Sequence, residues 1–206
     1  MKLYMANFAP NPRRVAMFLA EKAITDIPIE TLDLPAGQHR TPEFREKSPL
    51  AQVPALELED GACLTESRAI CSYLEALYPE PNLMGVDAKE RAFIEMWDRR
   101  IELGLAMPMM MWVRHGHPAL AAVETRQSAE VAAWYEAAGK RMARWLDQRL
   151  EHQPWIMGAR FTIADITAAA GLDFAKLLKW RPGEDLPHLA AWRDRFNARP
   201  AGAVGA

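Results

Sequence analysis

Residues 52–61 are Gln52-Val53-Pro54-Ala55-Leu56-Glu57-Leu58-Glu59-Asp60-Gly61, and residues 64–70 are Leu64-Thr65-Glu66-Ser67-Arg68-Ala69-Ile70. Val53 and Pro54 open a predicted strand, where proline removes one backbone donor and can adopt a cis peptide bond. Asp60 and Gly61 can supply the positive φ angles of a two-residue hairpin turn. The pattern predicts a strand, a tight turn, a return strand and then a helix.

Glu66 and Ser67 fall in the first turn of that helix, which we expect to extend to about Tyr78. Free N–H groups and the helix dipole favour a bound carboxylate at such a position. The backbone beside Val53 could pair with an extended peptide. This combination indicates a site for a small acidic peptide, although acids and hydroxyls also favour helix starts for structural reasons alone.

The residues upstream predict a βαβ unit. Residues 2–5 form a strand candidate, and Asn11 and Pro12 suit the cap and first position of a helix that extends to Lys22. Residues 27–34 alternate enough to form a second strand. Two strands joined through a helix are expected to be parallel.

Beyond about Asp87 the chain carries almost only helical periodicity. The long periodic segments are residues 88–114, 124–150, 162–178 and 187–197. The composition changes at residues 79–86, which contain two prolines and predict a linker. We therefore expect an α/β plus all-α protein, with an α/β domain at residues 1–78, a linker at 79–87 and a helical domain at 88–206.

One motif in the helical part has a structural interpretation. Thr162 can cap the helix that follows it, and Asp165 can reach back to the cap N–H, as in a capping box. We assign this motif no chemistry.

Composition argues against several classes of partner. The 206 residues carry a net charge of −2, so no strongly basic surface is expected for nucleic acid or anionic lipid. No apolar run approaches the roughly 20 residues of a membrane span, and no signal peptide is evident. We expect a cytoplasmic protein.

Cys63 and Cys71 lie eight residues apart and fit neither a zinc motif nor a Cys-x-x-Cys motif. We expect two buried free thiols and no metal site.

Four motifs, in this order and with these gaps, resemble the glutathione transferases. They are Asn11-Pro-Arg-Arg-Val, Ser48-Pro-Leu-Ala-Gln-Val-Pro-Ala-Leu, Leu64-Thr-Glu-Ser-Arg-Ala-Ile and Phe161-Thr-Ile-Ala-Asp-Ile-Thr. The chain is most similar to a bacterial and fungal branch whose first loop lacks a Ser, Tyr or Cys at the usual thiol-activating place. The resemblance implies a thioredoxin-like N-terminal domain, a helical C-terminal domain and a two-fold dimer.

The resemblance also implies roles for residues around the hairpin. Pro54 matches the family's cis-proline, and Val53 would pair its backbone with the cysteinyl unit of glutathione. Glu66 and Ser67 match the residues that hold the γ-glutamyl ammonium and carboxylate.

The glycyl end of glutathione has a looser assignment. His39, Arg40 and Gln52 lie where the family grips the glycyl carboxylate or nearby backbone. The alternative for His39 and Arg40 is an ordinary solvated loop.

The group that activates the thiol is not obvious. Ala9 stands where many relatives have a serine, and Tyr4 points elsewhere in the predicted strand. Asn11 remains, through its amide or the backbone N–H groups of the helix start. The alternative is that Asn11 only caps the helix.

A second candidate region is the helix that contains Met107 to His117. Some relatives place a serine and a histidine there to hold an activating water; Met110 takes the serine position, and the histidine position falls at Arg114 or His115. Met110 and Trp112 could line a pocket for an apolar electrophile. They could equally belong to the core or to a dimer surface.

The function that the resemblance implies is transfer of glutathione, as co-substrate, to an apolar alkyl or aryl electrophile in detoxification, or reduction of a peroxide or disulfide. The alternative is a non-catalytic ligand carrier or a regulatory or assembly protein, which Ala9 and Met110 favour because neither is polar. A thiol-disulfide oxidoreductase fits poorly, because no cysteine lies at the first helix start.

Overall fold

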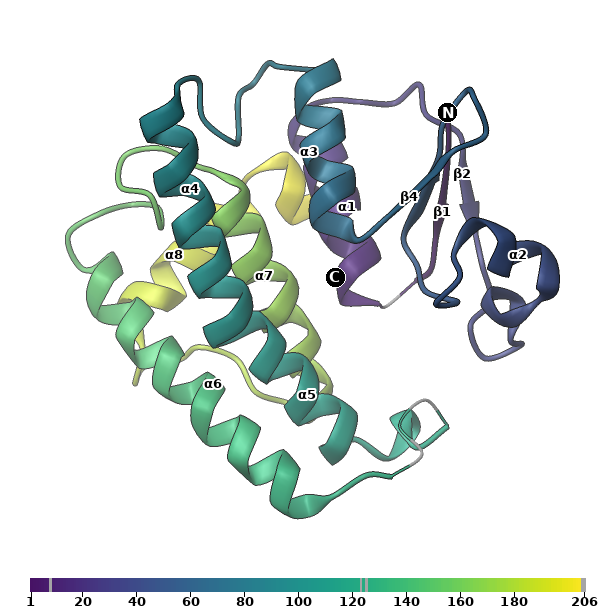
Figure 1. Cartoon of the computed structure of the whole chain (residues 1–206). Coiled ribbons are helices and arrows are strands. Elements are labelled where there is room, and N and C mark those ends of the chain that lie inside the picture. Colours follow the sequence, from purple (N-terminus) through teal and green to yellow (C-terminus); the bar gives the residue numbers. More distant parts are fainter. Residues whose placement is uncertain (8, 123, 125, 205–206) are drawn as a thin grey trace. The chain divides into compact units, whose positions relative to one another are not determined.

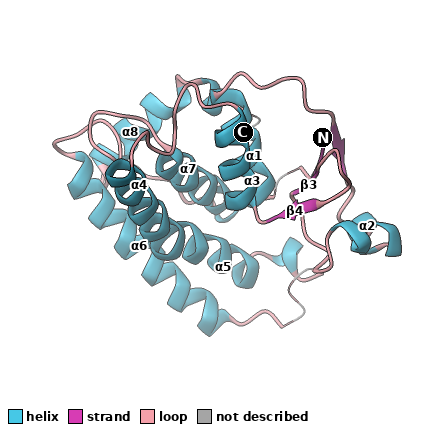
Figure 2. Cartoon of the chain, turned by 45° about the horizontal axis from the view of Figure 1, so that its top comes forward, coloured by secondary structure: helices cyan, strands magenta, loops and turns pink. Residues whose placement is uncertain are grey.

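The computed structural model describes residues 1–7, 9–122, 124 and 126–204. The chain divides into two units, Met1–Pro81 and Asn82–Ala206, each of which is described by itself (Figure 1). The division falls within residues 79–87. The four named strands all belong to the first unit, and Figure 2 draws strands in magenta and helices in cyan.

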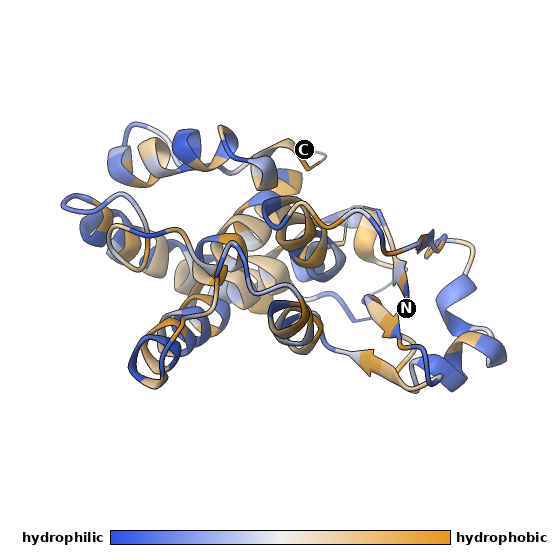
Figure 3. Ribbon diagram, turned by 90° about the horizontal axis from the view of Figure 1, so that it is seen from above, coloured by the Kyte–Doolittle hydropathy of each residue, from blue (hydrophilic) through white to orange (hydrophobic). Residues whose placement is uncertain are grey.

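The first unit is built on a sheet with strand order β2-β1-β3-β4. Its strands are β1 (Lys2–Met5), β2 (Ile29–Thr31), β3 (Ala55–Glu57) and β4 (Cys63–Thr65). β1 pairs parallel with β2 and antiparallel with β3, and β3 pairs antiparallel with β4. Leu3 of β1 and Leu56 of β3 are fully buried, whereas all three residues of β2 are exposed. The strands in Figure 3 accordingly carry both hydrophobic and hydrophilic colours.

Three α-helices accompany the sheet: α1 (Pro10–Glu21), α2 (Pro42–Lys47) and α3 (Ser67–Leu77). α1 and α3 lie side by side at one face of the sheet, and α2 lies on the other side (Figure 1). A short 3₁₀ helix, η1 (Gln38–Arg40), precedes α2. This arrangement confirms the thioredoxin-like fold that the resemblance implies.

Two local predictions were wrong. Helix α1 is capped by Ala9 rather than by Asn11, which lies inside the first helical turn. The β3–β4 connection is longer than a two-residue turn, because Gly61 N–H donates to Leu58 C=O and Leu58 N–H donates to Ala62 C=O. Of Asp60 and Gly61, only the glycine has a positive φ, at 83°. A turn followed by one left-handed glycine satisfies these bonds as well as a two-residue turn would.

A small core cluster fixes α2 and the segment before β3. Phe44 of α2 packs edge to face on Tyr4 of β1, with ring centroids 5.7 Å apart. Leu32 and Ala55 are buried with them, and Val53 packs against the cluster. The side chain of Val53 is therefore anchored on the core.

The other face of the first unit is tied together by a buried lysine. Lys22, directly after α1, donates to the backbone oxygens of Tyr78 at 2.6 Å and Pro81 at 2.9 Å. It also pairs with Glu75 at 2.6 Å. The last carbonyls of a helix have no partner within the helix, so this ammonium group satisfies the end of α3 and stabilises its packing on α1.

The second unit is helical, and in Figure 3 its helices carry both hydrophilic and hydrophobic residues. Its α-helices are α4 (Ala88–Ile101), α5 (Met107–Gly116), α6 (Ala129–Leu150), α7 (Ile163–Ala175) and α8 (Pro187–Asn197). Shorter helices are η2 (Glu102–Ala106), η3 (Pro118–Leu120), η4 (Lys176–Leu178) and η5 (Pro200–Ala203).

The segment expected as one helix over residues 88–114 is interrupted by η2, which is a π-helix. Pro108 follows it and lacks the N–H that would bond to Gly104, and a π-turn is a common way to absorb such a defect. η2 also lies very close to α7. A Cβ added to Gly171 would lie 2.5 Å from the Cα of Ala106, so only glycine fits there.

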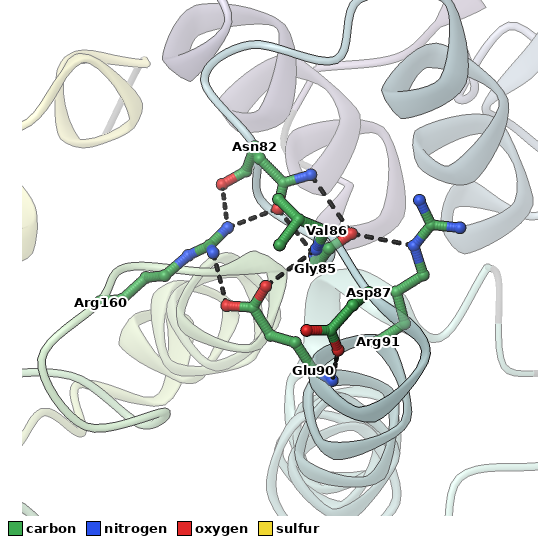
Figure 4. A network of polar contacts seen from close by, with 7 residues as sticks. All are labelled: Asn82, Gly85, Val86, Asp87, Glu90, Arg91 and Arg160. Carbon is green, nitrogen blue, oxygen red and sulfur yellow. Dashed lines mark hydrogen bonds and ion pairs between the residues drawn. The ribbon is translucent and has the colours of Figure 1, made fainter.

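A polar network fixes the start of this unit (Figure 4). The guanidinium of Arg160 donates to the carboxylate of Glu90 and to the backbone and side-chain oxygens of Asn82. Gly85 N–H donates to Asn82 Oδ1 at 2.7 Å, and Arg91 Nε donates to Gly85 C=O at 2.9 Å. The network ties the segment before α4 to the loop before α7.

The capping box predicted at Thr162 and Asp165 is present and is completely buried. Asp165 accepts from the backbone N–H groups of Thr162 and Ile156, both at 3.0 Å, and from Trp192 Nε1 at 2.9 Å. Burial raises the pKa of this carboxyl group from 3.8 to about 6, against the opposing effect of these donors. One side chain thus joins the loop before α7, the start of α7 and α8.

The raised pKa makes stability depend on pH. Between pH 4 and pH 6 the folded chain holds the Asp165 proton and the unfolded chain releases it, so the free energy of unfolding falls as pH rises through this range. A shift of two pKa units corresponds to about 3 kcal/mol. Asp165→Asn cannot titrate at this position. The difference in the free energy of unfolding in urea between the wild type and Asp165→Asn should therefore shrink from pH 4 to pH 6. Parallel pH curves for the two proteins would contradict this assignment.

Candidate functional site

A pocket in the first unit collects residues from four places in the chain. It lies among the start of α1, the loop before β3, the end of β4 and the start of α3. Its lining residues are Asn11, Ser48, Pro49, Leu50, Gln52, Val53, Pro54, Thr65, Glu66 and Ser67. The enclosed volume is only about 30 Å³, so a larger ligand would lie along an open groove and not inside a closed cavity.

Six of the residues predicted from the sequence therefore come together: Asn11, Gln52, Val53, Pro54, Glu66 and Ser67. They are separated by up to 56 positions in the chain. The hairpin and the parallel βαβ unit bring them to one end of the sheet.

The segment before β3 offers an unpaired backbone edge. The Val53–Pro54 peptide bond is cis, as predicted. Within the described part of the chain, the N–H and C=O of Val53 make no hydrogen bond. The N–H can donate to an extended peptide and the C=O can accept from it, as when one more strand is added to a sheet.

Glu66 turns the chain directly from β4 into α3. Its φ is +67° and its ψ is 112°, which is a strained conformation for a residue with a side chain. Such strain costs about 1–3 kcal/mol and is concentrated at functional sites. The sequence does not predict this feature, because nothing in the local residue types requires a positive φ at a glutamate.

Behind the pocket, a buried arginine contacts Ser67. Arg14 Nη1 donates to Ser67 Oγ at 2.9 Å, and the two residues are 2% and 3% exposed. Arg14 shares one face of α1 with Phe18 and Glu21, which are also buried. This helical spacing was the signal in the sequence that could have identified Arg14 as an inward-facing residue.

The loop between Ser48 and Gln52 is shaped by a side chain. Ser48 Oγ donates to Gln52 C=O at 2.8 Å and accepts from Gln52 N–H at 3.1 Å, and Ser48 is fully buried. Ala51, within this loop, has a φ of +53°. The serine holds the loop that forms one wall of the pocket.

The sequence leaves Asn11 as the candidate thiol-activating group and sets Tyr4 aside. Asn11 is exposed and lines the pocket, and its side chain is not used as a helix cap. The hydroxyl of Tyr4 donates to Glu57 at 2.7 Å. Burial and this hydrogen bond raise the pKa of Tyr4, which keeps its proton. Tyr4 is not among the lining residues.

His39 and Arg40 lie on η1 and are not among the residues that line the pocket. Arg40 Nε donates to His39 Nε2 at 3.2 Å. Partial burial, with the charges of Arg40 and Arg45, lowers the pKa of His39. The imidazole is therefore neutral at pH 7.

The remaining predicted residues belong to α5 in the second unit. Trp112 is buried and packs edge to face on Trp180, with centroids 6.3 Å apart. Arg114 pairs with Glu124 at 3.1 Å. Met110 and His115 are half-buried. Trp112 therefore contributes to the core of its own unit.

A wider hollow lies in the second unit among η2, α5 and α6, and we call it the tryptophan groove. Its volume is about 490 Å³, and its lining includes Leu103, Met107, Trp134 and Trp145. These side chains are 49%, 38%, 65% and 43% exposed. Large apolar side chains are usually buried, so this exposed cluster is a candidate interaction surface.

Two negative findings apply to the described residues. No group of three or more His, Cys, Asp or Glu side chains is arranged to hold a metal ion. None of the helices has the length and apolar character needed to cross a membrane.

Comparison with known proteins gives matches to two family models. Residues 3–82 match the N-terminal domain of glutathione S-transferases, and residues 105–200 match the C-terminal domain. The first match spans the whole set of elements that forms the pocket.

Individual relatives cover nearly the whole chain. Glutathione S-transferase 2 of Saccharomyces cerevisiae is 34% identical over 98% of this chain and 87% of its own length. The crystal structure of a glutathione S-transferase domain-containing protein from Marinobacter aquaeolei is 40% identical, with a TM-score of 0.92 over 98% of this chain and 99% of that one. Gtt2 from Saccharomyces cerevisiae is 34% identical, with a TM-score of 0.90 over 98% of each chain.

The wall of the pocket provides a stability test. Ser48→Ala removes both hydrogen bonds to Gln52 at a buried position, and we expect the free energy of unfolding in urea to fall by about 1–3 kcal/mol. The matched control is Ser72→Ala on the exposed side of α3, with an expected change within about 0.5 kcal/mol. Equal losses in the two variants would contradict the role given to Ser48.

Proposed function

Because the chain belongs to the glutathione transferase family, we propose that its first unit binds glutathione and that the bound thiolate attacks an apolar electrophile. The observation that carries this proposal is the pocket itself. It joins the open backbone of Val53 to the helix start at Ser67. A tripeptide with a charged head matches these two features.

Each part of glutathione has a proposed partner. The backbone of Val53 pairs with the cysteinyl unit. Ser67 donates its hydroxyl and N–H to the γ-glutamyl carboxylate, where the N-terminus of α3 favours negative charge, and Glu66 pairs with the γ-glutamyl ammonium. Gln52 holds the glycyl end. His39 and Arg40 remain proposed partners of the glycyl carboxylate on the family resemblance.

Asn11 is the proposed activating group. A free cysteine thiol has a pKa of about 8.5, so a donor must stabilise the thiolate at neutral pH. Asn11 lines the pocket with its amide uncommitted to capping, at the positive end of α1. Lowering the thiol pKa by two units requires about 2.7 kcal/mol, within the range of one or two donors and a helix end.

The second substrate is proposed to bind beside α5. On the family resemblance, Met110 remains the proposed apolar contact, and Arg114 and His115 remain the proposed polar contacts. Trp112 is buried and belongs to the core of its unit. In conjugation the thiol proton leaves to solvent, a carbon–sulfur bond forms and the electrophile's leaving group departs. Reduction of a peroxide or disulfide by two glutathione molecules is the other reaction that this site could support. The proposed setting is detoxification in the cytoplasm.

The second candidate function is a glutathione-binding carrier or assembly protein without catalysis. Ala9, which caps α1, has no polar side chain. This observation favours the non-catalytic function. Titration of the thiol of bound glutathione separates the two functions. A depressed pKa supports the transferase, and an ordinary pKa with intact binding supports the carrier.

We also propose that two copies of the chain form a homodimer through the tryptophan groove. The family resemblance implies a two-fold dimer, and a two-fold axis would bring the same groove of both copies together. The four large apolar side chains named above would then be removed from water.

Calorimetric titration with glutathione tests the binding site. Ser67→Ala removes the hydroxyl donor to the carboxylate, and affinity should fall about tenfold or more. The control Ser72→Ala lies on the same helix outside the pocket and should bind as the wild type does. Unchanged affinity in Ser67→Ala would count against the assignment.

Ultraviolet titration of the bound thiolate tests Asn11. In Asn11→Ala the thiol pKa should rise by about one unit, because one donor to the sulfur is lost. Asn197→Ala, an exposed residue at the end of α8, should leave the titration unchanged. A thiol pKa that stays constant in Asn11→Ala would show that another group stabilises the thiolate.

Sedimentation velocity tests the dimer. The wild type should sediment as a dimer and Trp134→Glu as a monomer, since a buried unpaired carboxylate opposes association. Leu177→Glu, an exposed leucine of η4 outside the groove, should remain dimeric. A dimeric Trp134→Glu would exclude the groove as the interface, and a monomeric wild type would refute the dimer.

A further inference from the structure

Ser67 does not act alone at the start of α3, because a buried guanidinium lies directly behind it. We propose that Arg14 is a positioning residue that holds the Ser67 hydroxyl in the orientation that donates to the γ-glutamyl carboxylate of glutathione. The inference rests on the proposed function and adds a residue that does not itself line the pocket.

The geometry places the two side chains in a defined donor–acceptor order. Arg14 Nη1 lies 2.9 Å from Ser67 Oγ. A guanidinium has only donors and stays protonated in proteins, so Ser67 must be the acceptor. The serine comes from the first position of α3 and the arginine from α1, 53 residues earlier.

This order leaves one direction for the hydroxyl proton. A serine hydroxyl has one proton and two lone pairs, and Arg14 occupies a lone pair. The proton then remains for an acceptor on the pocket side, where Ser67 is a lining residue. The carboxylate therefore meets a hydroxyl that is already oriented as a donor, which reduces the entropy lost on binding.

The positive charge of Arg14 also favours binding of the carboxylate. A hydrogen bond from a cation polarises the acceptor hydroxyl and strengthens its own donation. Arg14 is 2% exposed, so water screens its charge little and the field reaches the bound anion. Asn11 precedes it by one helical turn, so one side of α1 supplies both the proposed thiol partner and this cation.

Burial of an arginine is expensive compared with a residue that would only pack α1 against α3. Removing a guanidinium from water costs several kcal/mol unless hydrogen bonds and charge compensate it. A leucine or methionine would fill this helix face at lower cost. The arginine at this position is therefore better explained by its hydrogen bond to Ser67 than by packing alone.

The test compares two ligands by calorimetry: glutathione, and γ-aminobutyryl-cysteinyl-glycine, which lacks the γ-glutamyl α-carboxylate. Arg14→Gln should weaken binding of glutathione about tenfold and leave binding of the analogue unchanged. In a Ser67→Ala background, Arg14→Gln should cause a much smaller further loss, because the orienting part of its effect acts through the Ser67 hydroxyl. Arg13→Gln is the matched control, which removes one charge from the same helical turn.

Arg14→Lys keeps the charge and provides the second variant if Arg14→Gln folds poorly. It should retain part of the preference for glutathione over the analogue. Equal affinity of an Arg14 variant and the wild type for glutathione would overturn the inference, and so would equal losses for the two ligands. A wild type that fails to bind glutathione at all would refute the proposed function first, and the role of Arg14 with it.

Discussion

The conformation of Glu66 is the constraint on which the candidate site depends. With a φ of +67°, this residue passes the chain from β4 into α3 with no intervening loop. Ser67 is therefore buried at the first helical position, close enough to accept from Arg14. A relaxed glutamate in a longer connection would move the helix start away from β3 and from the open backbone of Val53. The strain lies at one residue, but the arrangement of all four chain segments that line the pocket depends on it.

Several buried polar groups in both units bond to partners from distant segments. In the first unit, Lys22 satisfies the end of α3 and Arg14 contacts its beginning. In the second unit, Asp165 accepts from three segments at once and is completely buried. Each group joins elements that are distant in sequence, and each would be costly to leave unpaired. These contacts select one arrangement of helices, whereas apolar packing by itself would tolerate several.

The site and the tryptophan groove have different chemical character. The pocket at Ser67 is small, is lined largely by polar residues and backbone, and presents directed donors. The groove is wide and aromatic, and presents side chains such as Trp134 and Trp145 that lack a directed charge. Directed donors suit a charged ligand of fixed shape. Broad apolar area suits association, in which the gain comes from removing surface from water.

Local sequence determined the parts of this protein that depend on neighbouring residues. The order of strands and helices, the parallel β1–β2 pair and the capping box at Thr162 follow from periodicity or short motifs. The cis bond before Pro54 follows from the family resemblance, because proline chemistry by itself only makes a cis bond accessible. Six of the ten residues that line the pocket were also predicted, five from the motif around the hairpin and Asn11 from the start of the first helix.

Tertiary structure alone decided the contacts between distant segments. The partner of Arg14, the positive φ of Glu66, the π-turns of η2 and the burial of Trp112 against Trp180 each depend on what packs beside the residue. Residue type and spacing show which face of a helix is buried, but not which atom it meets there. That information arises only when the chain is packed, since the free energy of a contact depends on both partners and on the water they exclude.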